Sequence, residues 1–208
     1  MSIAVAIYLF PEVEVLDFAG PFEVFTAASR VFKKLNPSAP APFTVFTVAD
    51  KVGTVRTRAG LVVTPDFTFA NHPAVDLLLV PGGVVTAELE KPEVIAWIER
   101  TATTTRLAAS VCTGASLLAR AGLLDGKKAT THWADIGDLR AEFPAVTVLD
   151  QRRWVDEGNI VTSAGISAGI DMSLHLVERF AGRELALRTA RQMEYDSHEA
   201  TTESRNGH

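Results

Sequence analysis

Short apolar runs alternate with longer segments of helical periodicity along most of the chain. Runs that are apolar almost throughout predict strands buried on both faces of a sheet, and they cover residues 3–10, 43–49, 76–80 and 107–111. Apolar positions recurring every three or four residues predict helices over about 17–34, from 91 onward, and over 113–121, 133–143, 166–180 and 183–195. This order is typical of a mainly parallel sheet with helices on both faces.

Shorter segments complete the predicted organisation. Val55 with residues 61–63, and residues 154–155 with 160–162, have the pattern of two hairpins, whereas residues 128–131 and 146–149 are short and β-like. Three prolines within residues 36–42 predict a loop. Because no repeat or linker divides the chain, we expect one α/β domain over residues 1–197, followed by a polar tail over 198–208.

Composition excludes several classes of protein. The 208 residues carry a formal net charge of −5, and such a mildly acidic surface disfavours binding to the negatively charged backbone of a nucleic acid. One cysteine cannot form an intrachain disulfide, and no Cys/His cluster has zinc-ligand spacing. The early apolar run is far shorter than the roughly 18 residues that span a bilayer, and it lacks the basic start of a signal peptide. We therefore expect a cytoplasmic protein with neither a metal nor a membrane or nucleic-acid partner.

Cys112 lies where a predicted strand meets a predicted helix. Gly114 and Ala115 are small enough for the sharp strand-to-helix turn of a nucleophile elbow, which presents its side chain at the carboxyl end of the sheet. Free amides and the positive end of a helix dipole at that place favour the thiolate and lower the pKa of Cys112. The alternative is a small cysteine packed in the core.

Two further features follow strands that end at the same edge of a doubly wound sheet. Gly82 and Gly83, after Pro81, can present bare amides, and one of these with the amide of Thr113 predicts an oxyanion hole. The alternative for this triplet is a plain turn. Asp17 follows the first strand, where apolar surroundings raise a carboxyl pKa and suit the group to proton transfer. The alternative for Asp17 is a helix N-cap.

Histidines add one weaker candidate. We interpret His132 as a structural residue or one that supports the groups around Cys112, with a direct proton-transfer role as the alternative. His72, His175, His198 and His208 form no cluster in the sequence, and His175 is interpreted as a residue packed within its helix.

Motifs spread over nearly the whole chain resemble the ThiJ/PfpI superfamily, also called class I glutamine amidotransferase-like proteins. The matching segments are 9–11 (LFP), 16–21 (LDFAGP), 80–83 (VPGG), 110–114 (SVCTG), 122–126 (GLLDG), 129–133 (ATTHW) and 164–171 (AGISAGID). They are most similar to the isonitrile hydratase branch and to the sensor domains of certain AraC-type regulators.

The resemblance implies a flavodoxin-like fold, a homodimer, a small-molecule substrate and no cofactor. It implies that Cys112 attacks the isonitrile carbon, that Asp17 is the general acid and base, and that water releases an N-formamide from a thioimidate. Amides near Gly83 and at Thr113 then stabilise developing negative charge. Thr113 stands where protease- and deglycase-like members commonly have histidine, which disfavours peptidase, glyoxalase and deglycase chemistry. The polar end of the chain disfavours direct DNA binding, and a ligand or redox sensor without catalysis is the alternative.

Overall fold

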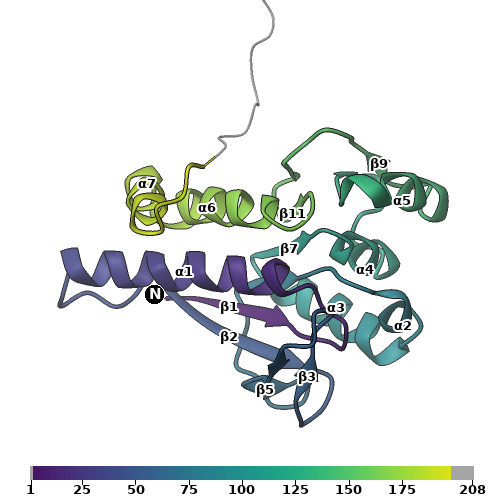
Figure 1. Cartoon of the computed structure of the whole chain (residues 1–208), viewed down its shortest axis with the longest axis horizontal. Helices are drawn as coiled ribbons and strands as arrows, with labels where there is room; N and C mark the ends of the chain where they lie inside the picture. The colour runs from purple at the N-terminus through teal and green to yellow at the C-terminus, as the bar shows by residue number, and fades with distance from the viewer. Residues whose placement is uncertain (1, 198–208) are drawn as a thin grey trace, which may run out of the picture.

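A computed structural model describes residues 2–197, which form a sheet with helices on both faces (Figure 1). The sheet is parallel except at one edge, where β10 runs antiparallel to its neighbour. In spatial order its strands are β10 (Trp154–Asp156), β11 (Ile160–Ser163), β7 (Leu107–Val111), β6 (Leu77–Val80), β1 (Ile3–Tyr8), β2 (Phe43–Ala49) and β5 (Phe67–Thr68). This is the flavodoxin-like α/β fold that the sequence predicts.

The helices form two groups on opposite faces of the sheet. On one face α1 (Val15–Leu35), α6 (Ala168–Ala181) and α7 (Arg183–Gln192) pack against one another, as Figure 1 shows. The other group comprises α2 (Thr86–Leu89), α3 (Pro92–Thr104) and α4 (Gly114–Arg120). A 3₁₀ turn, η1 (Trp133–Asp135), leads into α5 (Ile136–Glu142). Two small sheets pair β3 (Val55–Arg56) with β4 (Val62–Val63) and β8 (Lys128–Ala129) with β9 (Thr147–Val148).

Burial explains why the apolar runs became the central strands. Every residue of β6 and β7 is buried, as are the last four residues of β1. Burying one such aliphatic side chain contributes about 1.5–3 kcal/mol, so an uninterrupted apolar run is stable only between two covered faces. The predicted strands at the centre of the sheet are therefore confirmed. Both predicted hairpins are confirmed by the antiparallel pairing of their strands.

Several predicted boundaries are wrong. The first helix begins at Val15 rather than Asp17, because Glu14 caps it by accepting from the Val15 amide. The helix predicted from Trp133 begins as a 3₁₀ turn, and the one predicted from Ile166 begins at Ala168. Strand β5 and helix α2 were too short to give a pattern. The predicted tail over 198–208 lies outside the described residues.

The topology brings three chain segments to one edge of the sheet. Strand β6 lies between β1 and β7, so the carboxyl ends of these parallel strands are neighbours. The chain leaves β1 toward one side of the sheet and β6 toward the other, and ligands bind open α/β sheets at such a switch point. Within residues 2–197, no helix combines the length and apolar content required to cross a membrane.

Candidate active site

Cys112 lies in the strained turn between β7 and α4. Its backbone φ is 57°, a left-handed conformation that non-glycine residues rarely adopt. The turn is held from both sides, because the Cys112 amide donates to Ser163 O (3.2 Å) and Thr131 Oγ1 donates to Cys112 O (2.8 Å). A Cβ at Gly114 would lie only 2.1 Å from Val80 O, so this turn requires glycine there. The predicted strand–turn–helix geometry is confirmed.

The sulfur-bearing residue opens onto a cavity of about 420 Å³. Cys112 is only 7% exposed, so the cavity gives a narrow approach to the thiol rather than an open surface. The lining residues come from the start of α1, the β3–β4 hairpin, the loop after β6 with the start of α2, the elbow, the segment around η1 and the turn before α6. They are Glu14, Arg58, Gly83, Val84, Val85, Thr86, Cys112, Thr113, His132, Ala134, Asp135 and Ile166. Both polar and apolar side chains therefore surround a ligand placed against Cys112.

Asp17 lies behind the thiol on the first turn of α1 and is completely buried. Its Oδ2 accepts from the Gly82 amide at 3.0 Å, whereas Oδ1 has no hydrogen-bond partner of normal geometry among the described residues. Burial raises the pKa of Asp17 to about 7, although the Gly82 amide and the nearby Cys112 thiol lower it. The N-cap of α1 is Glu14, so the helix N-cap alternative for Asp17 is wrong. The prediction of a raised carboxyl pKa is confirmed.

Cys112 differs from the sequence prediction in its ionisation. Burial, and next the charge of Asp17, raise the pKa of its thiol to about 12. The Thr113 amide lowers this pKa by hydrogen bonding to the sulfur, but burial prevails. The expectation of a lowered pKa is thus wrong for the resting site. The helix behind the elbow has seven residues, so its dipole is small compared with the cost of burying a thiolate.

The Pro81-Gly82-Gly83 turn is closely fitted to the elbow. The Gly83 amide donates to Thr113 Oγ1 at 2.9 Å, and the same hydroxyl donates back to Gly83 O at 2.9 Å. A Cβ at Gly82 would lie 2.6 Å from Thr113 N and 2.8 Å from Cys112 Cβ. Since the Gly82 amide binds Asp17, neither glycine amide is free to form the predicted oxyanion hole in this state. Their role in anchoring the loop against the elbow is what the structure supports.

His132 lies at the side of the cavity and is partly buried. Its Nδ1 is 3.1 Å from Asp135 Oδ2, and its ring packs so tightly on Gly165 that a Cβ there would lie 2.1 Å from Cδ2. His132 thus has a fixed position beside Cys112, in keeping with the supporting role predicted for it. The neighbouring Trp133 ring is 78% exposed and contacts the His132 ring, with centroids 5.5 Å apart.

Eight cavity residues were missed by sequence reasoning, namely Glu14, Arg58, Val84, Val85, Thr86, Ala134, Asp135 and Ile166. Glu14 and Arg58 form a 3.8 Å ion pair at the cavity, and Asp135 is the partner of His132. Ile166 has a φ of 54°, and its amide interacts with Asp17. Glu14 is not one of the residue types that usually cap a helix, and nothing local indicates the conformation of Ile166, so no sequence signal marks either residue.

The remaining described histidines belong to structural pairs. His175 Nε2 is 2.7 Å from Asp156 Oδ2, which also pairs with Arg179, so His175 joins α6 to the β10–β11 hairpin rather than simply packing within the helix. His72 accepts from Trp97 Nε1 at 3.0 Å. His198 and His208 lie outside the described range.

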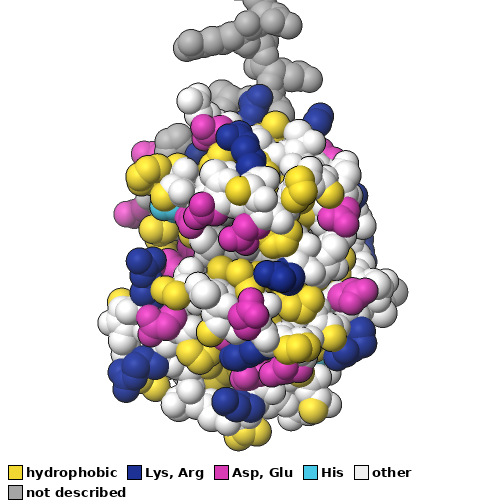
Figure 2. All heavy atoms as spheres, turned by 90° about the vertical axis from the view of Figure 1, so that its right-hand side faces the viewer, with side chains coloured by type: hydrophobic (Ala, Val, Ile, Leu, Met, Phe, Trp, Pro, Cys, Tyr) yellow, Lys and Arg dark blue, Asp and Glu magenta, His cyan; other side chains and the backbone are white. Residues whose placement is uncertain are grey.

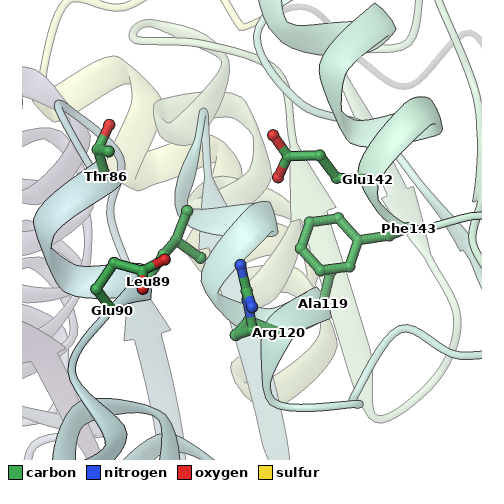
Figure 3. Close-up of a pocket in the computed structure, with 7 residues that line it drawn as sticks. All are labelled: Thr86, Leu89, Glu90, Ala119, Arg120, Glu142 and Phe143. Atoms are coloured by element: carbon green, nitrogen blue, oxygen red, sulfur yellow. The ribbon is translucent and has the colours of Figure 1, made fainter.

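A second cavity, of about 460 Å³, was not expected (Figure 3). It is lined by Thr86, Leu89, Glu90, Ala119, Arg120, Glu142 and Phe143. In the close-up the Arg120 side chain lies between Leu89 and Phe143, with its guanidinium carbon 5.9 Å from the Phe143 ring centroid. Thr86 also lines the Cys112 cavity, so the two cavities approach each other at the start of α2.

Known proteins are similar to this chain over most of its length. Isonitrile hydratase of Pseudomonas putida is 36% identical over 94% of this chain and 79% of its own length. The HTH-type transcriptional regulator GbdR of Pseudomonas aeruginosa is 38% identical over 66% of this chain, which covers only 37% of the regulator. The crystal structure of a ThiJ/PfpI family protein from Pseudomonas syringae has a TM-score of 0.83 at 28% identity, covering all of this chain and 80% of that one. Residues 3–179 match the model of one family, and the chain belongs to that family, DJ-1/PfpI.

Proposed function

We propose that this protein is a cysteine-dependent hydratase that converts isonitriles to N-formamides. The observation that carries the proposal is the buried pair of Cys112 and Asp17, in which a nucleophilic sulfur lies beside a carboxyl group whose pKa is raised to about 7. A general acid and base acts best when its pKa is near the working pH. The similarity to isonitrile hydratase over 94% of the chain supports the same reaction class.

The pair works as one unit that carries a single negative charge. At neutral pH the thiol is protonated, and Asp17 is divided between its charged and neutral forms. Transfer of the thiol proton to Asp17 moves the negative charge to sulfur without adding a second one. Because the carboxylate is one cause of the raised pKa of Cys112, its protonation removes that penalty at the moment when the thiolate forms.

The addition then needs both members of the pair. The sulfur of Cys112 forms a bond to the terminal isonitrile carbon while Asp17 returns the proton to that same carbon, which gives a thioimidate. Water next adds to the thioimidate carbon and gives a proton to Asp17. Asp17 then protonates the nitrogen. As the carbon–sulfur bond breaks, the added hydroxyl group passes its proton through Asp17 to the sulfur, so the formamide leaves and the thiol is restored. Overall the isonitrile gains one water molecule.

The occupied glycine amides also support this chemistry over acyl transfer. Addition to an ester or amide carbonyl produces an oxyanion at once and requires free donors for it. Addition to an isonitrile instead produces a carbon centre that must be protonated. In this site the Gly82 amide is bonded to Asp17 and the Gly83 amide to Thr113. The Thr113 amide, beside the sulfur, remains to stabilise charge during the attack.

The test is turnover of cyclohexyl isocyanide, followed as formamide production by chromatography and mass spectrometry. Cys112→Ser should abolish formation of the covalent adduct, and Asp17→Asn should lower turnover by about 10²–10⁴-fold while the thiol still reacts with alkylating agents. Asp138 is an exposed carboxylate on α5, so Asp138→Asn is the matched control and should retain full activity. No turnover of several isonitriles by reduced, folded protein would refute the proposal.

A sensor without catalysis is the second candidate, and the similarity to the regulator GbdR favours it. A sensor would bind isonitriles or related small molecules and raise the melting temperature without forming product. Mild peroxide with mass spectrometry would separate the redox version, since selective oxidation of Cys112 requires an accessible thiolate. The homodimer and the cytoplasmic location remain predictions, which light scattering and cell fractionation test directly.

A further inference from the structure

The cavity at Cys112 has more acidic than basic side chains. Glu14 and Asp135 line it directly, and they are opposed by Arg58, while His132 lies beside Asp135. Asp17 adds a third carboxyl group behind the sulfur. With His132 neutral, the formal charge of this group is −1 when Asp17 is protonated and −2 when it is ionised.

The one arginine does not offset this excess inside the cavity. Its ion pair with Glu14 is long, at 3.8 Å, and the Arg58 side chain is 60% exposed, so water screens its charge. The carboxylates, in contrast, act on the reacting groups. Glu14 raises the pKa of Asp17, and Asp135 raises the pKa of Cys112. Both charges are therefore felt where a ligand would contact the thiol.

The surface on one side of the molecule carries charges of both signs. Across the face that carries α2, α4 and α5, acidic, basic and apolar side chains are interspersed (Figure 2). Beside the cavity, the indole of Trp133 is 78% exposed and lies against His132. An exposed indole attracts a cation that lies over its face. Trp133 itself does not line the cavity, so the carboxylates of Glu14 and Asp135 are the groups that a cationic ligand would meet inside it.

We propose that the Cys112 cavity selects ligands by charge, and that its preferred substrates are isonitriles bearing a quaternary ammonium group, with neutral isonitriles next and anionic ones last. The substrate class rests on the proposed function, whereas the charge selection does not. Glu14 and Asp135 are the specificity-determining residues, because they line the cavity and carry its negative charge.

Charged thiol reagents test the selection without any turnover. The trimethylammonium-ethyl and sulfonato-ethyl methanethiosulfonates each form a disulfide with a thiolate and release methanesulfinate, and Cys112 is the only cysteine in the sequence. The rate ratio is the rate of reaction with the cationic reagent divided by the rate with the anionic reagent. At low salt we expect this ratio to be about tenfold higher for Cys112 than for 2-mercaptoethanol. At 1 M salt the Cys112 ratio should fall toward the 2-mercaptoethanol value. A ratio equal to or below that of the free thiol overturns the proposal.

Three variants locate the effect. Asp135→Asn and Glu14→Gln should each lower the rate ratio several-fold, and the glutamine can still accept from the Val15 amide at the helix start. Asp138→Asn should leave the ratio unchanged, because Asp138 lies on α5 but does not line the cavity. Equal effects of all three variants would indicate net protein charge rather than the cavity and would overturn the assignment.

Matched isonitriles then test the substrate class. The 2-(trimethylammonio)ethyl and 3,3-dimethylbutyl isonitriles have the same shape and differ by one charge, and 3-isocyanopropanoate supplies the anion. We expect kcat/KM to fall in that order. If no isonitrile is turned over, the proposed function fails while the reagent ratio still decides the charge selection. Faster turnover of the anion would overturn the selection alone.

Discussion

Replacing Asp17 with asparagine should stabilise the protein, and increasingly so as the pH rises. The carboxyl group is fully buried, and burial raises its pKa from 3.8 to about 7. In the unfolded chain Asp17 loses its proton near pH 3.8, whereas the folded protein keeps that proton until about pH 7. Rising pH therefore favours the unfolded state throughout this interval, because the folded state binds more protons.

The size of this effect follows from the two pKa values. A pKa difference of one corresponds to 1.36 kcal/mol, so a rise from 3.8 to about 7 corresponds to about 4 kcal/mol of lost stability above pH 7. That is a large share of the roughly 5–15 kcal/mol by which domains are stable. The asparagine of the Asp17→Asn variant would remain neutral at every pH and could still accept from the Gly82 amide through its side-chain oxygen.

Urea unfolding of both proteins at several pH values measures this difference. Between pH 5 and pH 8 the stability of the Asp17→Asn variant relative to wild type should increase by about 3 kcal/mol, since the remaining loss occurs below pH 5. Asp138→Asn, at an exposed site, is the control and should follow wild type. A pH-independent difference between Asp17→Asn and wild type, or one that decreases with pH, would contradict a carboxyl group held neutral by burial.

Three further changes test other parts of the structure. Gly114→Ala should lower the free energy of unfolding by about 2–4 kcal/mol because its Cβ would overlap a backbone oxygen, whereas Gly137→Ala, with open space around it, should raise the melting temperature slightly. The alkylation rate of Cys112 by iodoacetamide should increase up to pH 10 without a plateau, because its pKa is about 12, and a plateau near pH 7 would refute this. Tyr8→Phe removes the hydroxyl that donates to buried Glu88 and should cost about 1–3 kcal/mol in urea unfolding; an unchanged midpoint would show that Glu88 needs no such donor.

Much of the fold could be predicted because its signals are local. The uninterrupted apolar runs at β1, β6 and β7 need two covered faces, and the sheet provides them. The small residue at Gly114 predicts the sharp turn at Cys112, and the structure gives that turn its left-handed backbone. Motifs along the chain predicted the family, which the match over residues 3–179 confirms.

The raised pKa of Cys112 and the occupied glycine amides could not be predicted, because both depend on contacts between distant segments. The pKa of Cys112 is raised by burial and by Asp17, which lies 95 residues earlier in the chain (112 minus 17). Neither effect can be recognised from the residues around the elbow. The same holds for the glycine amides. Gly82 and Gly83 offer bare donors in sequence, but Asp17 and Thr113 occupy these donors after folding.

These two departures from expectation have one chemical consequence. Attack on carbonyl substrates is favoured by an activated thiolate and several free donors for an oxyanion, but in the resting state the thiol is protonated and both glycine amides are occupied. Addition across an isonitrile carbon requires that sulfur and a proton reach the same atom. A neutral thiol next to a carboxyl group that gains and loses its proton near pH 7 delivers both in sequence and keeps only one charge in the buried pair. The raised pKa values therefore favour isonitrile addition over peptidase chemistry.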